Sequence, residues 1–298
     1  MKQLGWILTI SRPRFWPYLA GPWAVGMVTV SNSISDFKST LFWTGLLFFL
    51  WPANFFLYGL NDFADGDTDK YNPKKQQYED LYQHNQNKVL WIILAVIAVF
   101  AGIFTWFFPT VESQIVFVIW VFFSTFYSMR PLRFKARLLL DSCSNVLYIL
   151  PGVMVFLIFE PLANLSWPLV AAAWVWAMGM HLFSALPDIK SDLSAKVKTT
   201  AVWLGFKKAT LMTLAYYTTA ALLCGVYVNI WLGVLGFLCY GIPTIYIYFT
   251  KNTENVFVLY KKFPFINLFS GATIFILSLI HISEPTRPRL ISYAVFCL

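Results

Sequence analysis

The residues best suited to chemistry lie in two acidic motifs, NDFADGDTD at 61–69 and DIKSD at 188–192. In the first motif, Asp62, Asp65 and Asp69 are spaced i, i+3 and i+7, which places the three carboxylates on one face of a helix. Like charges on one face repel each other and need a cation. Carboxylate oxygens suit Mg²⁺, which proteins usually share between one or two carboxylates and substrate phosphates. The spacing therefore predicts a magnesium site, with a solvated acidic loop as the alternative.

The second motif follows another apolar run. Asp188 and Asp192 are spaced i, i+4, and Lys190 lies between them. His181 lies seven residues before Asp188 and therefore on the same helical face. It is either part of the site or a histidine of the protein core. The second acidic pair strengthens the interpretation of the first motif as a site.

Four polar residues lie within or beside apolar runs. Asn61 begins the first motif, and Asn54 lies two turns before it inside the apolar run. Asp141 and Asn145 are spaced i, i+4 at the start of a later run. An ionisable group in a membrane helix is a functional candidate. A helix cap, or a salt bridge from Asp141 to Arg137 one turn back, is the equal alternative.

A basic loop, YSMRPLRFKAR at 127–137, contains four Lys and Arg residues within eight positions. It begins at Tyr127 and includes Arg133 and Lys135. Arg and Lys are the usual ligands of phosphate oxygens in proteins. A diphosphate bridged to Mg²⁺ on one side and to Arg133 and Lys135 on the other would neutralise both sets of charge. The alternative is the ordinary positive charge of a cytoplasmic loop.

The composition is that of a membrane protein. Hydrophobic residues make up 58% of the 298 residues, charged residues only 12%, and the mean hydropathy is +0.63. Soluble domains have about 25% charged residues. The apolar runs are too long for barrel strands. The four cysteines are scattered and predict neither a disulfide framework nor a zinc site.

Nine apolar runs predict an all-α polytopic protein. Of the 22 Lys and Arg residues, 19 fall on one side of this topology. The positive-inside rule then places the N-terminus, both acidic motifs and the basic loop in the cytoplasm, with no role for nucleic acid. The predicted spans are 15–30, 41–60, 89–108, 113–129, 138–158, 167–186, 209–228, 230–249 and 265–281.

The C-terminal tail does not fit this pattern. IHISEPTRPRLISYAVFCL, at 280–298, places two Pro and two Arg between apolar segments on the outer side. It resembles the translation of a sequencing adapter, and we expect the natural C-terminus to be missing from about Leu277 onward. We therefore predict one membrane domain over 1–276 and an atypical tail over 277–298.

These motifs resemble those of the UbiA-type intramembrane prenyltransferases. NDFADGDTD matches the NDxxDxxxD signature of that family, DIKSD resembles the end of its second aspartate motif, and YSMRPLRFK resembles its basic loop. One departure is Ala185, where the family often has the first aspartate of the second motif. The resemblance implies a nine-helix bundle in a prokaryotic cytoplasmic membrane, with an active site on the cytoplasmic side.

The resemblance also implies an activity. Mg²⁺ and the residues around it would ionise an allylic diphosphate, dimethylallyl diphosphate or longer, and the prenyl group would pass to a lipophilic acceptor in the bilayer. The candidate metal-binding and catalytic residues are Asp62, Asp65, Asp69, Asp188 and Asp192. The candidate substrate-binding residues are Asn54, Asn61, Tyr127, Arg133, Lys135, Lys190, Asp141, Asn145 and His181.

Four stretches resemble the lycopene elongases within that family: SRPRFWPYLAGP, YGLND, NPKK and HLFSALPD. The expected acceptor is therefore lycopene, which such enzymes extend by prenyl units. A quinone-precursor ring or haem is the alternative acceptor. A secondary transporter is the alternative of another class, although transporters usually show internal repeats and acidic groups near the midplane, whereas the aspartates here cluster at one face.

Overall fold

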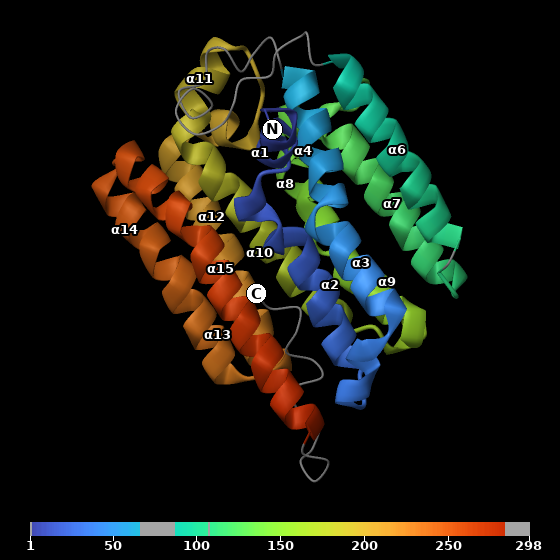
Figure 1. Cartoon of the computed structure of the whole chain (residues 1–298). Coiled ribbons are helices and arrows are strands. Elements are labelled where there is room, and N and C mark those ends of the chain that lie inside the picture. Colours follow the sequence, from blue (N-terminus) through green and yellow to red (C-terminus); the bar gives the residue numbers. More distant parts are fainter. Residues whose placement is uncertain (1, 66–86, 107, 284–298) are drawn as a thin grey trace.

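A computed structural model of the chain describes residues 2–65, 87–106 and 108–283 (Figure 1). The side chains of residues 2–5, 65, 87–89, 274, 277, 278 and 280–283 lie outside this description. Over the described residues the secondary structure consists of helices and turns, with no strand. The all-α prediction is confirmed. The predicted tail falls mostly outside this range, so its character stays a prediction.

The longer α-helices lie side by side in a bundle, and shorter helices lie between them (Figure 1). Short 3₁₀ segments join several of them, of which η5 (Phe134–Ala136), η6 (Ser144–Tyr148) and η8 (Leu186–Asp188) concern the site. The helices are α1 (Lys2–Ile10), α2 (Pro17–Val30), α3 (Thr40–Leu50), α4 (Pro52–Asp65), α6 (Asn87–Trp106), α7 (Val111–Ser128), α8 (Leu140–Cys143), α9 (Leu150–Phe159), α10 (Trp167–Ala185), α11 (Ile189–Ser194), α12 (Thr200–Tyr227), α13 (Ile230–Gly236), α14 (Ile242–Thr250) and α15 (Thr253–Ser283).

Each of the nine predicted apolar ranges overlaps a helix within the described part of the chain. The count of nine membrane spans is not confirmed, because several of these helices are short or broken. Within the residues that the structure describes, five helical segments are long and apolar enough to cross a membrane, and a sixth qualifies if a pair bent by 42° is one span. The five are 40–64, 111–128, 167–194, 200–227 and 230–250, and the bent pair is 140–148 with 150–159.

The break between α3 and α4 shows how a span can be interrupted. Pro52 begins α4, and proline cannot donate the backbone hydrogen bond that a continuous helix needs. The side chain of Asn54 compensates, because its Nδ2 donates to the carbonyls of Phe49 at 2.8 Å and Leu50 at 3.0 Å. Asn54 is fully buried. Its amide therefore stabilises the break in a setting where water is not available to do so.

Packing between α2 and α9 is close. A Cβ atom at Gly26 would lie 2.4 Å from the carbonyl oxygen of Gly152, so the two backbones meet where only glycine fits.

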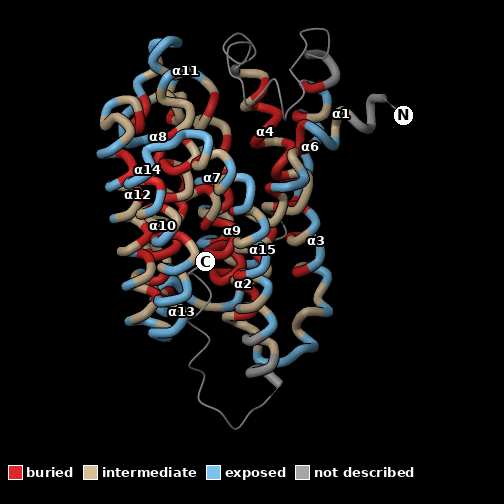
Figure 2. Tube along the Cα trace, turned by 90° about the vertical axis from the view of Figure 1, so that its left-hand side faces the viewer, coloured by how far each residue is buried: buried red, intermediate tan, exposed pale blue. Residues whose placement is uncertain are grey.

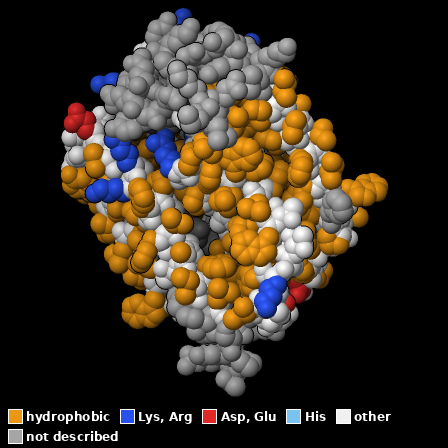
Figure 3. Space-filling view, viewed as in Figure 1, with side chains coloured by type: hydrophobic (Ala, Val, Ile, Leu, Met, Phe, Trp, Pro, Cys, Tyr) orange, Lys and Arg blue, Asp and Glu red, His pale blue; other side chains and the backbone are white. Residues whose placement is uncertain are grey.

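Buried residues lie along the inner faces of the helices and exposed residues along the outer faces (Figure 2). Many exposed side chains are apolar, including Trp106, which is 86% exposed. Figure 3 shows hydrophobic side chains over most of the middle of one face, as expected for a surface in contact with lipid.

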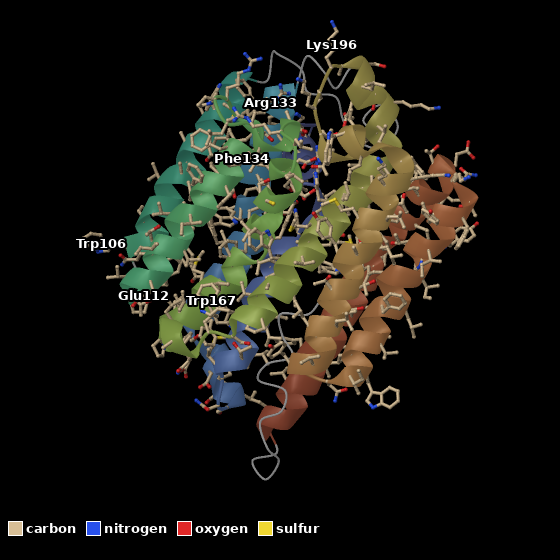
Figure 4. All side chains as sticks on the ribbon, turned by 180° about the vertical axis from the view of Figure 1, so that it is seen from behind. Trp106, Glu112, Arg133, Phe134, Trp167 and Lys196 are labelled. Carbon is tan, nitrogen blue, oxygen red and sulfur yellow. The ribbon has the colours of Figure 1, made fainter. Side chains whose placement is uncertain are left out.

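The described part of the first acidic motif, residues 61–65, lies at the same end of the bundle as the second motif and the basic loop. The C-terminal end of α4 and helix α11 are both at the top of Figure 1. Arg133 and Lys196 lie toward this end in Figure 4, whereas Trp106, Glu112 and Trp167 lie toward the other. The common location of the motifs is confirmed. The cytoplasmic orientation of this end stays a prediction.

Candidate active site

A cavity of about 380 Å³ lies inside the bundle, between α2, α4, α7, η6, α10 and α15. Polar residues line it where α4, α7 and α10 reach their C-terminal ends: Arg12, Asn61, Tyr127, His181 and Ser184. Farther along α2 and α15 the lining is mostly apolar, with Gly21, Val25, Gly271 and Phe275 among its residues. The cavity therefore joins a polar end to a long apolar part, which suits a charged head group beside an apolar chain.

Asn61 connects the first acidic motif to the basic loop. Its Oδ1 accepts a hydrogen bond from Lys135 Nζ at 2.7 Å and another from Ser128 Oγ at 3.0 Å. Lys135 belongs to η5, and Arg133 just before it has the left-handed φ of 42° that turns the chain into this segment. The structure thus brings Lys135 to Asn61, which lines the polar end of the cavity, and the sequence analysis names both as candidate substrate-binding residues.

Asp62 is buried and forms an ion pair that the sequence analysis did not predict. Arg12 Nη2 donates to Asp62 Oδ1 at 2.7 Å, and the two side chains are 12% and 8% exposed. The guanidinium also lies over the ring of Tyr58, 4.7 Å from its centroid. Arg12 lines the cavity, so it brings a positive charge to the polar end. The sequence signal for Arg12 is its place in SRPRFW, a stretch that resembles the lycopene elongases.

The second motif begins where α10 gives way to η8 and α11. Pro187 lies in η8, so the helix is interrupted before Asp188. Asp188 and Asp192 are both partly buried, while Lys190 is exposed. Asp192 Oδ2 accepts a hydrogen bond of 3.4 Å from Thr199, which caps the start of α12.

Asp141 is fully buried and does not pair with Arg137. It accepts hydrogen bonds from the backbone nitrogens of Ser142 at 2.8 Å and Thr200 at 2.7 Å, and from the Thr200 hydroxyl. Arg137 instead donates to the carbonyl of Pro131. The salt-bridge alternative is therefore wrong. The helical spacing rule fails here because Leu139, between the two residues, has a φ of 65° and the helix begins only at Leu140.

His181 and Asn145 both line the cavity. His181 Nδ1 lies 3.4 Å from the hydroxyl of Tyr127, and its Nε2 lies 3.9 Å from Asp141 Oδ2. Asn145 Nδ2 donates to the carbonyl of Asp141 at 2.7 Å. The structure thus brings Tyr127, Asp141, Asn145 and His181 together, although they come from three separate segments. Asn54 does not line the cavity, and its role in binding substrate stays a prediction.

Two of the five predicted metal ligands, Asp69 and the side chain of Asp65, lie outside the described part of the chain. In the described part of the chain, no three His, Cys, Asp or Glu side chains come close enough together to hold a metal ion. The oxygen atoms of Asn61, Asp62 and Asp188 are nevertheless of the kind that Mg²⁺ prefers. The five-aspartate site therefore stays a prediction.

The chain matches the UbiA prenyltransferase family over residues 15–279. A protein named lycopene elongase/hydratase from Haloarcula japonica is 43% identical over 202 residues, which cover 68% of each chain. One of the same name from Halobacterium salinarum is 41% identical over 206 residues, 68% of this chain and 73% of that protein. Another from Corynebacterium glutamicum is 27% identical but covers 93% of this chain and 97% of its own length.

Two solved structures share the fold. A UbiA homologue from Archaeoglobus fulgidus, bound to DMAPP and Mg²⁺, has a TM-score of 0.61 at 19% identity and covers 98% of this chain and 99% of its own. A UbiA homologue from Aeropyrum pernix has a TM-score of 0.68 at 14% identity and covers 90% and 97%. The resemblance from motifs is thereby confirmed over nearly the whole chain. The protein is an integral membrane prenyltransferase that belongs to the UbiA family.

Proposed function

We propose that this enzyme transfers the prenyl group of an allylic diphosphate to lycopene. The observation that carries the proposal is the cavity, because its polar end is lined by Arg12 and Asn61 and its apolar part extends along α2 and α15. A diphosphate matches the polar end and a hydrocarbon chain the apolar part. Lycopene is favoured over other lipophilic acceptors because relatives 38–43% identical are named lycopene elongase/hydratase.

The aspartates suit Mg²⁺ as a cofactor. All five candidate ligands, Asp62, Asp65, Asp69, Asp188 and Asp192, offer carboxylate oxygens, the ligand type that this ion takes in proteins. A bound Mg²⁺ would supply positive charge to the diphosphate as it leaves. Cytoplasmic exposure of this end is part of the proposal, since it gives a water-soluble donor access to the aspartates.

The protein's own cations would share this task. Lys135 and Arg133 would bind diphosphate oxygens and stabilise the charge that grows as the carbon–oxygen bond breaks. Arg12 would add a third positive group at the same end. Aromatic residues that line the cavity, including Tyr58, Tyr148 and Trp176, would face the allyl cation and keep water from it.

The basic loop can be tested separately from the aspartates. Replacing Lys135 by alanine should raise the KM for the donor by about 10- to 100-fold, because a charged hydrogen bond is worth about 1.5–3 kcal/mol. The KM for the acceptor should change little, since Lys135 would touch only phosphate. Steady-state kinetics with each substrate varied in turn measures both. Lys208→Ala is the matched control, since Lys208 is exposed on α12. An unchanged donor KM in Lys135→Ala would exclude Lys135 from the donor site.

The acceptor is tested by expression in a host that accumulates lycopene, followed by mass analysis of the pigments. We expect carotenoids heavier than lycopene by one and by two prenyl units. A host whose lycopene remains unmodified, while membrane fractions prenylate a hydroxybenzoate, a naphthoate or haem, would contradict the acceptor and leave the prenyltransferase assignment intact.

A further inference from the structure

We infer that Tyr127, His181 and Asp141 form a relay that accepts the proton released when the prenylated product forms. This inference rests on the proposed function, because it concerns the fate of the product cation in that reaction. It assigns a catalytic role to His181 and Tyr127, which line the cavity, and a positioning role to Asp141 behind them.

The three side chains form a line that leads from the cavity into the protein. The Tyr127 hydroxyl lies 3.4 Å from His181 Nδ1 on one edge of the imidazole ring. On the other edge, Nε2 lies 3.9 Å from Asp141 Oδ2. In the tautomer with its proton on Nε2, the ring points that proton at the carboxylate and leaves Nδ1 free to accept the proton of Tyr127. Catalytic hydrogen bonds are often this long before substrate binds.

Asp141 is held as a carboxylate in a fixed orientation. It accepts two backbone N–H bonds and the Thr200 hydroxyl, all of which favour the charged form. Arg137, the nearest basic residue in sequence, is turned toward Pro131. Among the described residues, His181 is the one basic side chain within 4 Å of the Asp141 carboxylate. A fully buried charge therefore lies beside an imidazole, where it would stabilise the imidazolium ion.

The reaction needs such an acceptor. When the allyl cation adds to the acceptor alkene, the alkene π pair forms the new carbon–carbon bond and leaves a cation on the acceptor. A neighbouring C–H bond then breaks, its electron pair forms a new double bond, and the proton must leave. If water adds to the cation instead, one O–H proton of that water must leave. Both outcomes release one proton into a cavity that is mostly apolar.

The relay supplies an acceptor for this proton. The proton from carbon or from water passes to the Tyr127 oxygen while Tyr127 gives its own proton to His181 Nδ1. The imidazolium that results carries its Nε2 proton toward Asp141. The imidazolium then returns a proton to Tyr127 as the Tyr127 hydroxyl gives its proton to water at the polar end of the cavity, which restores the neutral imidazole ring. The alternative is that His181 is a core histidine whose nitrogens have hydrogen-bond partners but no role in the reaction. However, His181 lines the cavity, and its two ring nitrogens face Tyr127 and a buried carboxylate.

The test separates donor ionisation from product formation. The purified protein is given dimethylallyl diphosphate, Mg²⁺ and lycopene, and both diphosphate release and prenylated carotenoid are measured. His181→Gln should lower prenylated product by about 100-fold, a typical contribution of general base catalysis. Diphosphate release should fall by less than about threefold. An adduct cation that keeps its proton reverts to lycopene and the allyl cation, so the lost product should appear as dimethylallyl alcohol once water captures that cation. Asp141→Asn should lower product by about 10-fold, and the double variant should be no worse than His181→Gln, because the two residues act as one unit.

Tyr127→Phe removes one oxygen atom and serves if His181→Gln does not fold. It should lower product relative to diphosphate release by at least about 10-fold. Tyr217→Phe is the matched control, because it removes the same atom from a buried tyrosine whose hydroxyl donates to Met180 Sδ. We expect that control to leave both measurements unchanged.

Two results would overturn the relay. Full product formation by both His181→Gln and Tyr127→Phe would show that another acceptor, such as the released diphosphate, takes the proton. An equal fall in diphosphate release and product would show that the residues only support the structure. A wild-type protein that forms no prenylated carotenoid would instead overturn the proposed function, so the two failures are distinguishable.

Discussion

Replacing Asp188 by asparagine is expected to lower the rate of diphosphate release by about 100- to 1,000-fold, the usual cost of losing one group that stabilises charge in a transition state. Asp188 is the last residue of η8, at the end of the bundle where the basic loop also lies. It is partly buried, and the neutral amide of asparagine fits the same space. We therefore expect an unchanged thermal unfolding temperature in detergent and a loss of activity that added Mg²⁺ does not restore.

The control for this variant is Glu112→Gln. Glu112 is exposed at the start of α7, toward the opposite end of the bundle (Figure 4). The change removes the same charge from the same protein but should leave the rate of diphosphate release within about twofold of wild type. If Asp188→Asn retained full activity, or if this variant remained active in the presence of EDTA, Asp188 would be excluded from a metal site.

The second large effect concerns the Arg12–Asp62 pair. Asp62→Ala should reduce the free energy of unfolding by about 3–5 kcal/mol, because it removes the carboxylate that lies 2.7 Å from a mostly buried guanidinium. It should also abolish diphosphate release, since Asp62 is a proposed ligand of the metal. Stability is measured as thermal or denaturant unfolding in detergent, and activity by release of diphosphate.

The double variant Arg12→Met/Asp62→Leu separates the two effects. Replacing both charges by apolar groups of similar size should restore most of the lost stability. Activity should remain absent, because neither the carboxylate nor the cation is restored. If the double variant were as unstable as Asp62→Ala, the pair would not be coupled. If it regained activity, neither residue would act in the reaction.

The sequence predicts the helices well because long apolar runs leave little choice in a membrane. It does not predict where those helices break. At Pro52 the interruption depends on the Asn54 side chain, which donates to the carbonyls of Phe49 and Leu50 as partners, and between η6 and α9 the chain bends by 42°. These partners become visible only when the tertiary structure is known. The sequence therefore predicts that the helices exist, whereas the number that span the membrane depends on breaks that tertiary contacts determine.

The site shows a similar division. The sequence predicts that the motifs of Asn61 and Lys135 share one end of the bundle, and the structure adds that these two side chains are in contact. The pairing of Arg12 with Asp62 joins residues 50 positions apart, and no helical spacing rule indicates it. The spacing of Arg137 and Asp141 suggests an ion pair that the structure does not contain, because the chain between them is not helical. Local rules therefore predict side chains on one helix but not contacts across turns.

The most direct test of the central claim uses the purified enzyme in lipid, supplied with dimethylallyl diphosphate, Mg²⁺ and lycopene. We predict release of diphosphate together with carotenoids that are heavier than lycopene by one and by two prenyl units, and neither product once EDTA removes the metal. Lycopene that stays unchanged while a hydroxybenzoate, a naphthoate or haem becomes prenylated under the same conditions would contradict the proposed acceptor.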